Sequence, residues 1–157
     1  MTIIKAVIDK SMLAVILPML SSIDDYKVLS DKPISVSVER VLAKAWRANR
    51  LARCERLLAE GKKPPPVHLV RYRLNGESWY GVSDGNHRVV AASNAGNKTI
   101  RAVVTCESPI RPERYVIIKN VLWRNAYNER YGRYLQEVQA DIAPEMVAAL
   151  LSIGVGK

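Results

Sequence analysis

The run Asp84-Gly85-Asn86-His87-Arg88 carries the residue types in this 157-residue chain that are best suited to hold an anion. It precedes an apolar run, residues 89–92, that has the character of a helix. A helix that starts here leaves its first backbone N–H groups unpaired, with a partial positive charge. Gly85 has no side chain to block a ligand, Arg88 can grip two phosphate or carboxylate oxygens, and His87 can donate a hydrogen bond or move a proton near neutral pH. This stretch therefore predicts an anion site.

The same stretch has a plainer explanation. Asp-Gly is a common turn, and a short acid such as Asp84 before a helix is often only a cap. His87 and Arg88 on a first helical turn can be solvated charges without a ligand. An anion pocket and a solvated turn both stay open at this point.

The elements that must position the turn follow from the flanking pattern. Residues 67–73 and 78–82 read as two antiparallel strands joined at Asn75-Gly76, and Pro64-Pro65-Pro66 forces an extended entry into the first of them. The second strand delivers the turn. Residues 99–106 are predicted to return as a final strand, after Gly96 has ended the helix as a C′ residue.

Residues 34–38 alternate like a half-buried strand, and residues 39–60 are predicted to form one long helix that Gly61 closes. Its apolar positions are expected to make a buried stripe: Val41, Leu42, Ala45, Trp46, Ala48, Leu51, Ala52, Leu57 and Leu58. Three arginines recur at every third residue and are predicted to form a ridge on one side: Arg47, Arg50 and Arg53. The ridge is either a solvated face or a track for phosphates.

The two ends of the chain are predicted to be structural. Residues 2–8 read as a short strand, and Ser11 is expected to cap a helix to about Leu20 that covers one face of the sheet. Residues 114–134 and the segment after Pro144 are predicted to be helical. The first of these interleaves arginines with tyrosines, which suits stacking on nucleic-acid bases and equally suits a helix packed on the sheet.

The composition narrows the class of protein. A net charge of +9 and a pI near 9.8 favour a polyanionic partner such as DNA or RNA, or an anionic ligand. Cys54 and Cys106 are isolated, so neither a zinc site nor a disulfide framework is predicted. The longest apolar run, residues 12–20, is about half a membrane span and lacks a cleavage pattern after it. We therefore expect no membrane partner and a cytoplasmic location.

The turn motif, its proline-rich entry at residues 63–70 and the stretch 96–100 resemble the ParB/sulfiredoxin-like superfamily over roughly residues 34–105. In ParB partition proteins the turn reads Gly-Glu-Arg-Arg, in sulfiredoxin Gly-Cys-His-Arg, and in ParB-like free serine kinases Asp-Gly-His-His-Arg. The resemblance implies that Gly85 and Arg88 are phosphate-binding positions, and His87 matches two of the three motifs. Asn86 stands where sulfiredoxin has its reactive Cys, so sulfiredoxin chemistry is not expected.

The resemblance implies an α+β fold, a small mixed sheet with flanking helices and a helical C-terminal extension. Residues 1–33 are then a covering segment, residues 34–108 the ParB/sulfiredoxin-like core, and residues 109–157 a helical extension packed on the core.

The resemblance also implies a nucleotide-binding protein, with a nucleoside di- or triphosphate held with or without magnesium. The phosphate-binding residues are then Gly85, Asn86, His87, Arg88 and Arg50. Whether the protein hydrolyses the nucleotide or transfers its phosphate stays open. The candidates for proton transfer are His87 first and Asp84 second. Glu39 is a weaker candidate, for the acid that the family's enzymes place near the first strand–helix junction.

Two other classes stay open. One is a non-catalytic DNA-binding or partition-type module whose contacts would come from five basic residues: Arg47, Arg50, Arg53, Lys98 and Arg124. Against it, no helix-turn-helix follows the core. The other is a ParB-like nuclease with Asp84 and His87 around a metal, for which the sequence lacks a visible carboxylate cluster, so no metal ligands are predicted.

Overall fold

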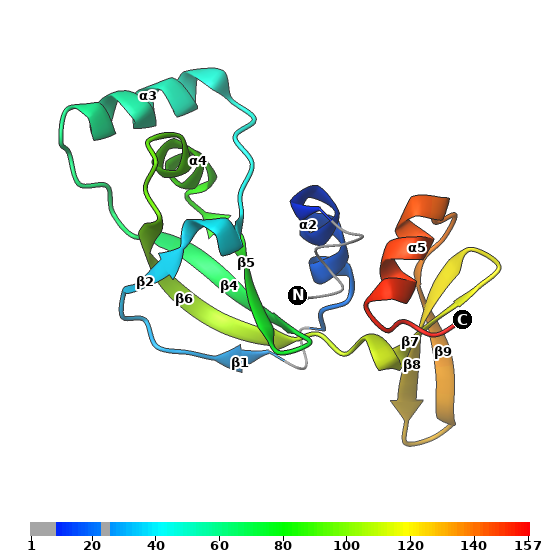
Figure 1. Cartoon of the computed structure of the whole chain (residues 1–157). Helices are drawn as coiled ribbons and strands as arrows, with labels where there is room; N and C mark the ends of the chain where they lie inside the picture. Colours follow the sequence, from blue (N-terminus) through cyan, green and yellow to red (C-terminus); the bar gives the residue numbers. More distant parts are fainter. Residues whose placement is uncertain (1–8, 23–25) are drawn as a thin grey trace. The chain divides into compact units, whose positions relative to one another are not determined.

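The computed structural model describes residues 9–22 and 26–157 (Figure 1). The chain forms two compact units: one is Ser21–Pro109, and the other combines Met1–Leu20 with Ile110–Lys157. The strand predicted over residues 2–8 lies outside the described residues.

A mixed six-stranded sheet forms the centre of the unit Ser21–Pro109. Its strands are β1 (Lys27–Val28), β2 (Ile34–Ser37), β3 (Val41–Leu42), β4 (Val67–Leu74), β5 (Glu77–Asp84) and β6 (Thr99–Pro109). The order is β1-β6-β4-β5-β3, and β2 also pairs with β6. β4 runs antiparallel to β5 but parallel to β6, and a helix lies between β5 and β6 in the chain. The predicted hairpin and the α+β class are confirmed.

Three short or medium helices accompany this sheet: the 3₁₀ turn η2 (Val38–Arg40), α3 (Ala48–Ala59) and α4 (Asn86–Asn94). Valines and other apolar side chains from η2, α4 and five of the strands form one core: Val36, Val38, Val41, Val67, Leu69, Tyr80, Val89, Ala102 and Val104. Figure 1 shows α3 lying beside α4, with which it makes its main contacts. The core thus supports α4, and α4 supports α3.

The helix predicted over residues 39–60 is wrong in its first half. The chain instead makes η2, pairs Val41 with Tyr80 in the short parallel strand β3, and runs without regular structure to Arg47, the N-cap of α3. Burial of Val38 and Val41 in the sheet core outweighs the helix propensity of this stretch.

The buried stripe predicted for that helix is also wrong, because no residue of α3 is buried. Trp46 is 60% exposed and Leu57 is 37% exposed. Leu51, Cys54 and Leu58 are only half-buried, and their spacing places them on one side of α3. α3 is therefore a surface helix whose main neighbour is α4.

The second unit is built differently from the predicted helical extension. It contains α2 (Lys10–Met19), the 3₁₀ turn η3 (Pro112–Arg114), α5 (Pro144–Ser152) and an antiparallel sheet of β7 (Tyr115–Ile118), β8 (Val121–Asn128) and β9 (Gly132–Gln139). The helix after Pro144 is confirmed, whereas the helix over residues 114–134 is wrong. Lys119 and Asn120 both have positive φ, the geometry of a tight hairpin turn, and this turn forces the apolar residues on either side into strands.

The N-terminal helix α2 belongs to this second unit, where it contacts α5. Its cap is Asp9, whose Oδ1 accepts from the Met12 amide at 2.9 Å, and Ser11 lies inside the helix, so the predicted cap is wrong. Pro18 stands in the last turn of α2. The predicted packing of residues 109–157 on the core stays a prediction.

Gly85 makes the junction of β5 and α4 possible. It is the N-cap of α4 in the left-handed conformation, with φ +107°. A Cβ at this position would lie 2.5 Å from Cγ1 of the buried Val67. Gly96 also has positive φ, +81°, directly after the last turn of α4, which confirms it as the C′ residue, but nothing lies within 4 Å of its Cβ position.

This contrast predicts the effect of two matched substitutions. We expect Gly96→Ala to lower the free energy of unfolding by about 1 kcal/mol, because only the backbone conformation is strained. Gly85→Ala adds a clash with Val67 and should cost about 3 kcal/mol. Urea denaturation of both variants measures this, and equal losses would contradict the close approach at Gly85.

Candidate functional site

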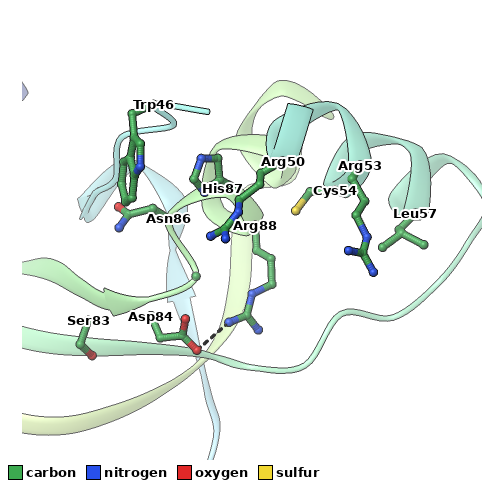
Figure 2. Close-up of a pocket in the computed structure, with 11 residues that line it drawn as sticks. Trp46, Arg50, Arg53, Cys54, Leu57, Ser83, Asp84, Asn86, His87 and Arg88 are labelled. Atoms are coloured by element: carbon green, nitrogen blue, oxygen red, sulfur yellow. Dashed lines mark hydrogen bonds and ion pairs between the residues drawn. The ribbon is translucent and has the colours of Figure 1, made fainter. Parts of the chain in front are cut away.

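A pocket of about 550 Å³ lies between α3 and the turn that joins β5 to α4. The turn contributes the stretch 83–88, and the α3 side contributes five residues: Trp46, Arg50, Arg53, Cys54 and Leu57. Figure 2 shows Trp46 at one end of this row and Leu57 at the other, with Arg50, His87 and Cys54 between them. The structure thus brings Arg50 and Arg53 to the same pocket as the predicted turn motif.

The Arg88 side chain closes the turn against the chain that enters β4. Its Nη1 donates to the carbonyl oxygens of Pro65 at 2.8 Å and Pro66 at 3.3 Å. Its Nη2 donates to Oδ2 of Asp84 at 3.1 Å, one helical turn earlier. The proline-rich entry therefore supplies carbonyl acceptors that orient Arg88, and Asp84 neutralises part of its charge.

The side chains of Asn86 and His87 hold the segment that leads into α3. Oδ1 of Asn86 accepts from the Lys44 amide at 3.1 Å, and Nε2 of His87 accepts from the Arg47 amide at 3.2 Å. For Nε2 to accept, it carries no proton, so the proton of the neutral ring is on Nδ1. The His87 side chain is buried, with its residue 8% exposed, and its ring meets that of Trp46 edge-on at 4.9 Å. In this structure the histidine serves as an anchor for residues 44–47.

Positive charge dominates the pocket. Among the described residues that line it, Arg50, Arg53 and Arg88 stand against Asp84 as the one carboxylate, a formal surplus of two positive charges. No hydrogen bond or ion pair of the Arg50 or Arg53 side chain is seen within the described ranges. Such a concentration of cations beside a helix N-terminus favours an anionic ligand.

Other predicted site residues lie elsewhere. Glu39 is exposed on η2 and does not line the pocket. Arg47 caps α3 instead of lying within it, so the three-arginine ridge is reduced to Arg50 and Arg53. Lys98 is exposed between α4 and β6, and Arg124 is half-buried on β8 of the other unit. Of the five residues predicted for nucleic-acid contact, Arg50 and Arg53 thus lie on α3 with Arg47 at its start, whereas Lys98 and Arg124 belong to other parts of the chain.

The sequence reasoning missed Trp46, Cys54 and Leu57 as pocket residues. The predicted single helix over residues 39–60 puts Trp46 and Leu57 in a buried stripe, whereas both line the pocket in the structure. Both cysteines are free and half-exposed. Within residues 9–22 and 26–157, no three His, Cys, Asp or Glu side chains gather closely enough to hold a metal ion. None of the described helices has the length and apolar character needed to cross a membrane.

Comparison with known proteins gives only distant likenesses. No family model and no curated protein matches the sequence. Sulfiredoxin from Arabidopsis thaliana is 16% identical, covering 50% of this chain and 88% of that one, with a TM-score of 0.40. A free serine kinase in complex with AMP is 21% identical over 51% of this chain, with a TM-score of 0.39. A conserved hypothetical protein from Pyrococcus furiosus is 16% identical over 62% of this chain, with a TM-score of 0.40.

This chain spans 33% of the kinase and 38% of the Pyrococcus protein. The α+β class rests on the strands and helices described above, and the resemblance of the turn motif to ParB/sulfiredoxin-like proteins stays a prediction.

The anchoring role of His87 predicts a local effect. His87→Phe keeps an aromatic ring beside Trp46 but removes the acceptor, so the free energy of unfolding should fall by about 1 kcal/mol and the Arg47 amide should exchange faster with deuterium. His87→Gln is the control, because its amide oxygen can restore an acceptor. Unchanged exchange at Arg47 in the Phe variant would contradict the anchor.

Proposed function

We propose that the pocket between α3 and the β5–α4 turn binds the phosphate groups of a nucleoside di- or triphosphate. The observation that carries this proposal is the convergence of Arg50, Arg53 and Arg88 on the N-terminal turn of α4 around one pocket. Its volume lies in the range of pockets that hold small organic ligands. Arginine suits this role because its planar guanidinium pairs with two phosphate oxygens at once.

The start of α4 supports the proposal independently of the arginines. Because the N-cap is Gly85, no side chain of the cap residue satisfies the first N–H groups of the helix. Unpaired N–H groups at a helix start are donors for phosphate oxygens. The pocket thus offers both backbone donors and arginine side chains. The resemblance of Gly85 and Arg88 to the phosphate-binding positions of ParB/sulfiredoxin-like proteins agrees with this use.

The pocket suits a magnesium ion only if bound phosphates supply part of the ion's ligands. Mg²⁺ is usually held by one or two carboxylates together with substrate phosphates and water. Asp84 is 72% exposed by its side chain and is the carboxylate available for that role. When bound, the ion would neutralise phosphate charge, and Arg88 would be released from Asp84 to donate to the nucleotide.

The proposal does not require turnover. The His87 Nε2 atom already accepts from the Arg47 amide, so a proton transfer to this atom would need that hydrogen bond to break. We infer that His87 positions the α3 side of the pocket. Hydrolysis or phosphate transfer, if it occurs, then depends on Asp84 more than on His87, the reverse of the order predicted from the sequence.

The arginines of α3 give the first test. We expect Arg50→Ala or Arg53→Ala to weaken nucleotide binding about tenfold or more, because each removes a charged contact worth about 1.5 to 3 kcal/mol. Arg56→Ala is the matched control, since Arg56 is exposed on the same helix but does not line the pocket. Isothermal titration calorimetry with ATP and CTP, with and without Mg²⁺, measures the effect. No nucleotide binding by the unmodified protein, or equal losses in all three variants, would contradict the proposal.

Asp84 gives the second test. Without Mg²⁺, Asp84→Asn should bind ATP about two- to fivefold more tightly, because the carboxylate no longer competes with phosphate for Arg88; an exposed pair of this kind is worth less than about 1 kcal/mol. With Mg²⁺, loss of the carboxylate ligand of the ion should cancel that gain in affinity.

Phosphate release, measured in parallel for this variant and His87→Gln, assigns any chemistry: a 100-fold loss of the release rate marks a proton-transfer or metal-binding residue. Weaker Mg²⁺-free binding by Asp84→Asn would contradict the competing role.

A further inference from the structure

We propose that Trp46 is the platform on which the aromatic base of the bound nucleotide stacks, so that the pocket selects nucleoside phosphates over inorganic polyphosphates. This inference rests on the proposed phosphate site and adds the residue that recognises the rest of the ligand. Three properties of Trp46 carry it: its exposure, the rigidity of its surroundings and its place in the pocket.

The exposure of Trp46 is unusual for its residue type. Its surface is 60% accessible, whereas Trp79 in the same unit is 6% accessible. Tryptophan is normally among the more buried residues, because its ring carries a large apolar area. An exposed ring at the wall of a cationic pocket presents that area to whatever enters the pocket.

The indole is also held in place before any ligand arrives. The backbone is tied on both sides of it, through the Lys44 amide to Asn86 and through the Arg47 amide to His87. The His87 ring meets the indole edge-on, with 62° between the ring planes. A ring that is already ordered loses little conformational entropy when a ligand stacks on it, which favours affinity.

The position of Trp46 matches a ligand with two different ends. Figure 2 shows Trp46 next to Asn86 and His87, with Arg50 beside His87, so the indole adjoins the phosphate-binding elements. Leu57 marks the other end and is 37% exposed. A molecule with phosphates over the start of α4 and an aromatic ring at the Trp46 end would use both features. Because every base has a π-face, stacking of this kind does not choose among the bases.

The test is a two-by-two comparison of ligand and substitution. Trp46→Leu keeps an apolar side chain but removes the aromatic face, and ATP and inorganic tripolyphosphate share the phosphate chain but differ in the base. We expect Trp46→Leu to weaken ATP binding about tenfold and to leave tripolyphosphate binding unchanged. Trp46→Phe should retain most of the ATP affinity, and Leu57→Ala is the control for the opposite end of the pocket. Calorimetry supplies the affinities, and amide exchange at Arg47 checks that residues 44–47 keep their place.

The outcomes separate this inference from the proposed function. If tripolyphosphate binds and Trp46→Leu weakens ATP and tripolyphosphate equally, or weakens neither, the phosphate site stands and the stacking role of Trp46 is overturned. If Leu57→Ala, not Trp46→Leu, removes the preference for ATP, the base lies at the opposite end and the inference is again overturned. If the unmodified protein binds neither ligand, the proposed function itself fails.

Discussion

Two hydrogen bonds from the first turn of α4 to a segment about forty residues earlier in the chain determine the form of the pocket. Asn86 and His87 accept from the amides of Lys44 and Arg47, and this fixes the stretch that carries Trp46 and starts α3. α3 itself has no buried residue, so it depends on this attachment and on its contacts with α4. The two bonds and the contacts between α3 and α4 together fix where Arg50 and Arg53 lie relative to the turn.

The sheet supplies the second constraint. β5 ends at Asp84, and the left-handed Gly85, which passes close to Val67, turns the chain directly into α4. The Arg88 guanidinium then donates to the carbonyl oxygens of Pro65 and Pro66, directly before β4. It thus links the segment that leads into β4 to the helix that follows β5. Asp84 neutralises part of the positive charge of Arg88. The pocket is thus cationic and also contains one carboxylate, Asp84.

Short-range sequence patterns predicted the elements around the Asp84–Arg88 turn correctly. The elements predicted wrongly are those whose structure depends on burial against distant parts of the chain. Asn75-Gly76, the alternating strands and Gly96 each have a short-range cause, so the hairpin and α4 follow from the sequence. The sequence around Val41 is typical of a helix, but in the structure Val41 pairs with Tyr80 in a parallel strand. Because the helix therefore starts later than predicted, Trp46 is exposed at the pocket wall instead of buried in a core. The hairpin at Lys119-Asn120 was missed because neither residue is a glycine, although both adopt positive φ.

The most direct measurement of the central claim is an NMR titration of the uniformly ¹⁵N-labelled chain with ATP. If the pocket holds the nucleotide's phosphates at the start of α4, the largest shifts should occur at the backbone amides of Gly85, Asn86, His87 and Arg88 and at the side-chain Nε–H of Arg50, while the strands β7 to β9 stay unperturbed. Shifts confined to residues outside the pocket, or no saturable shift at all, would contradict the account.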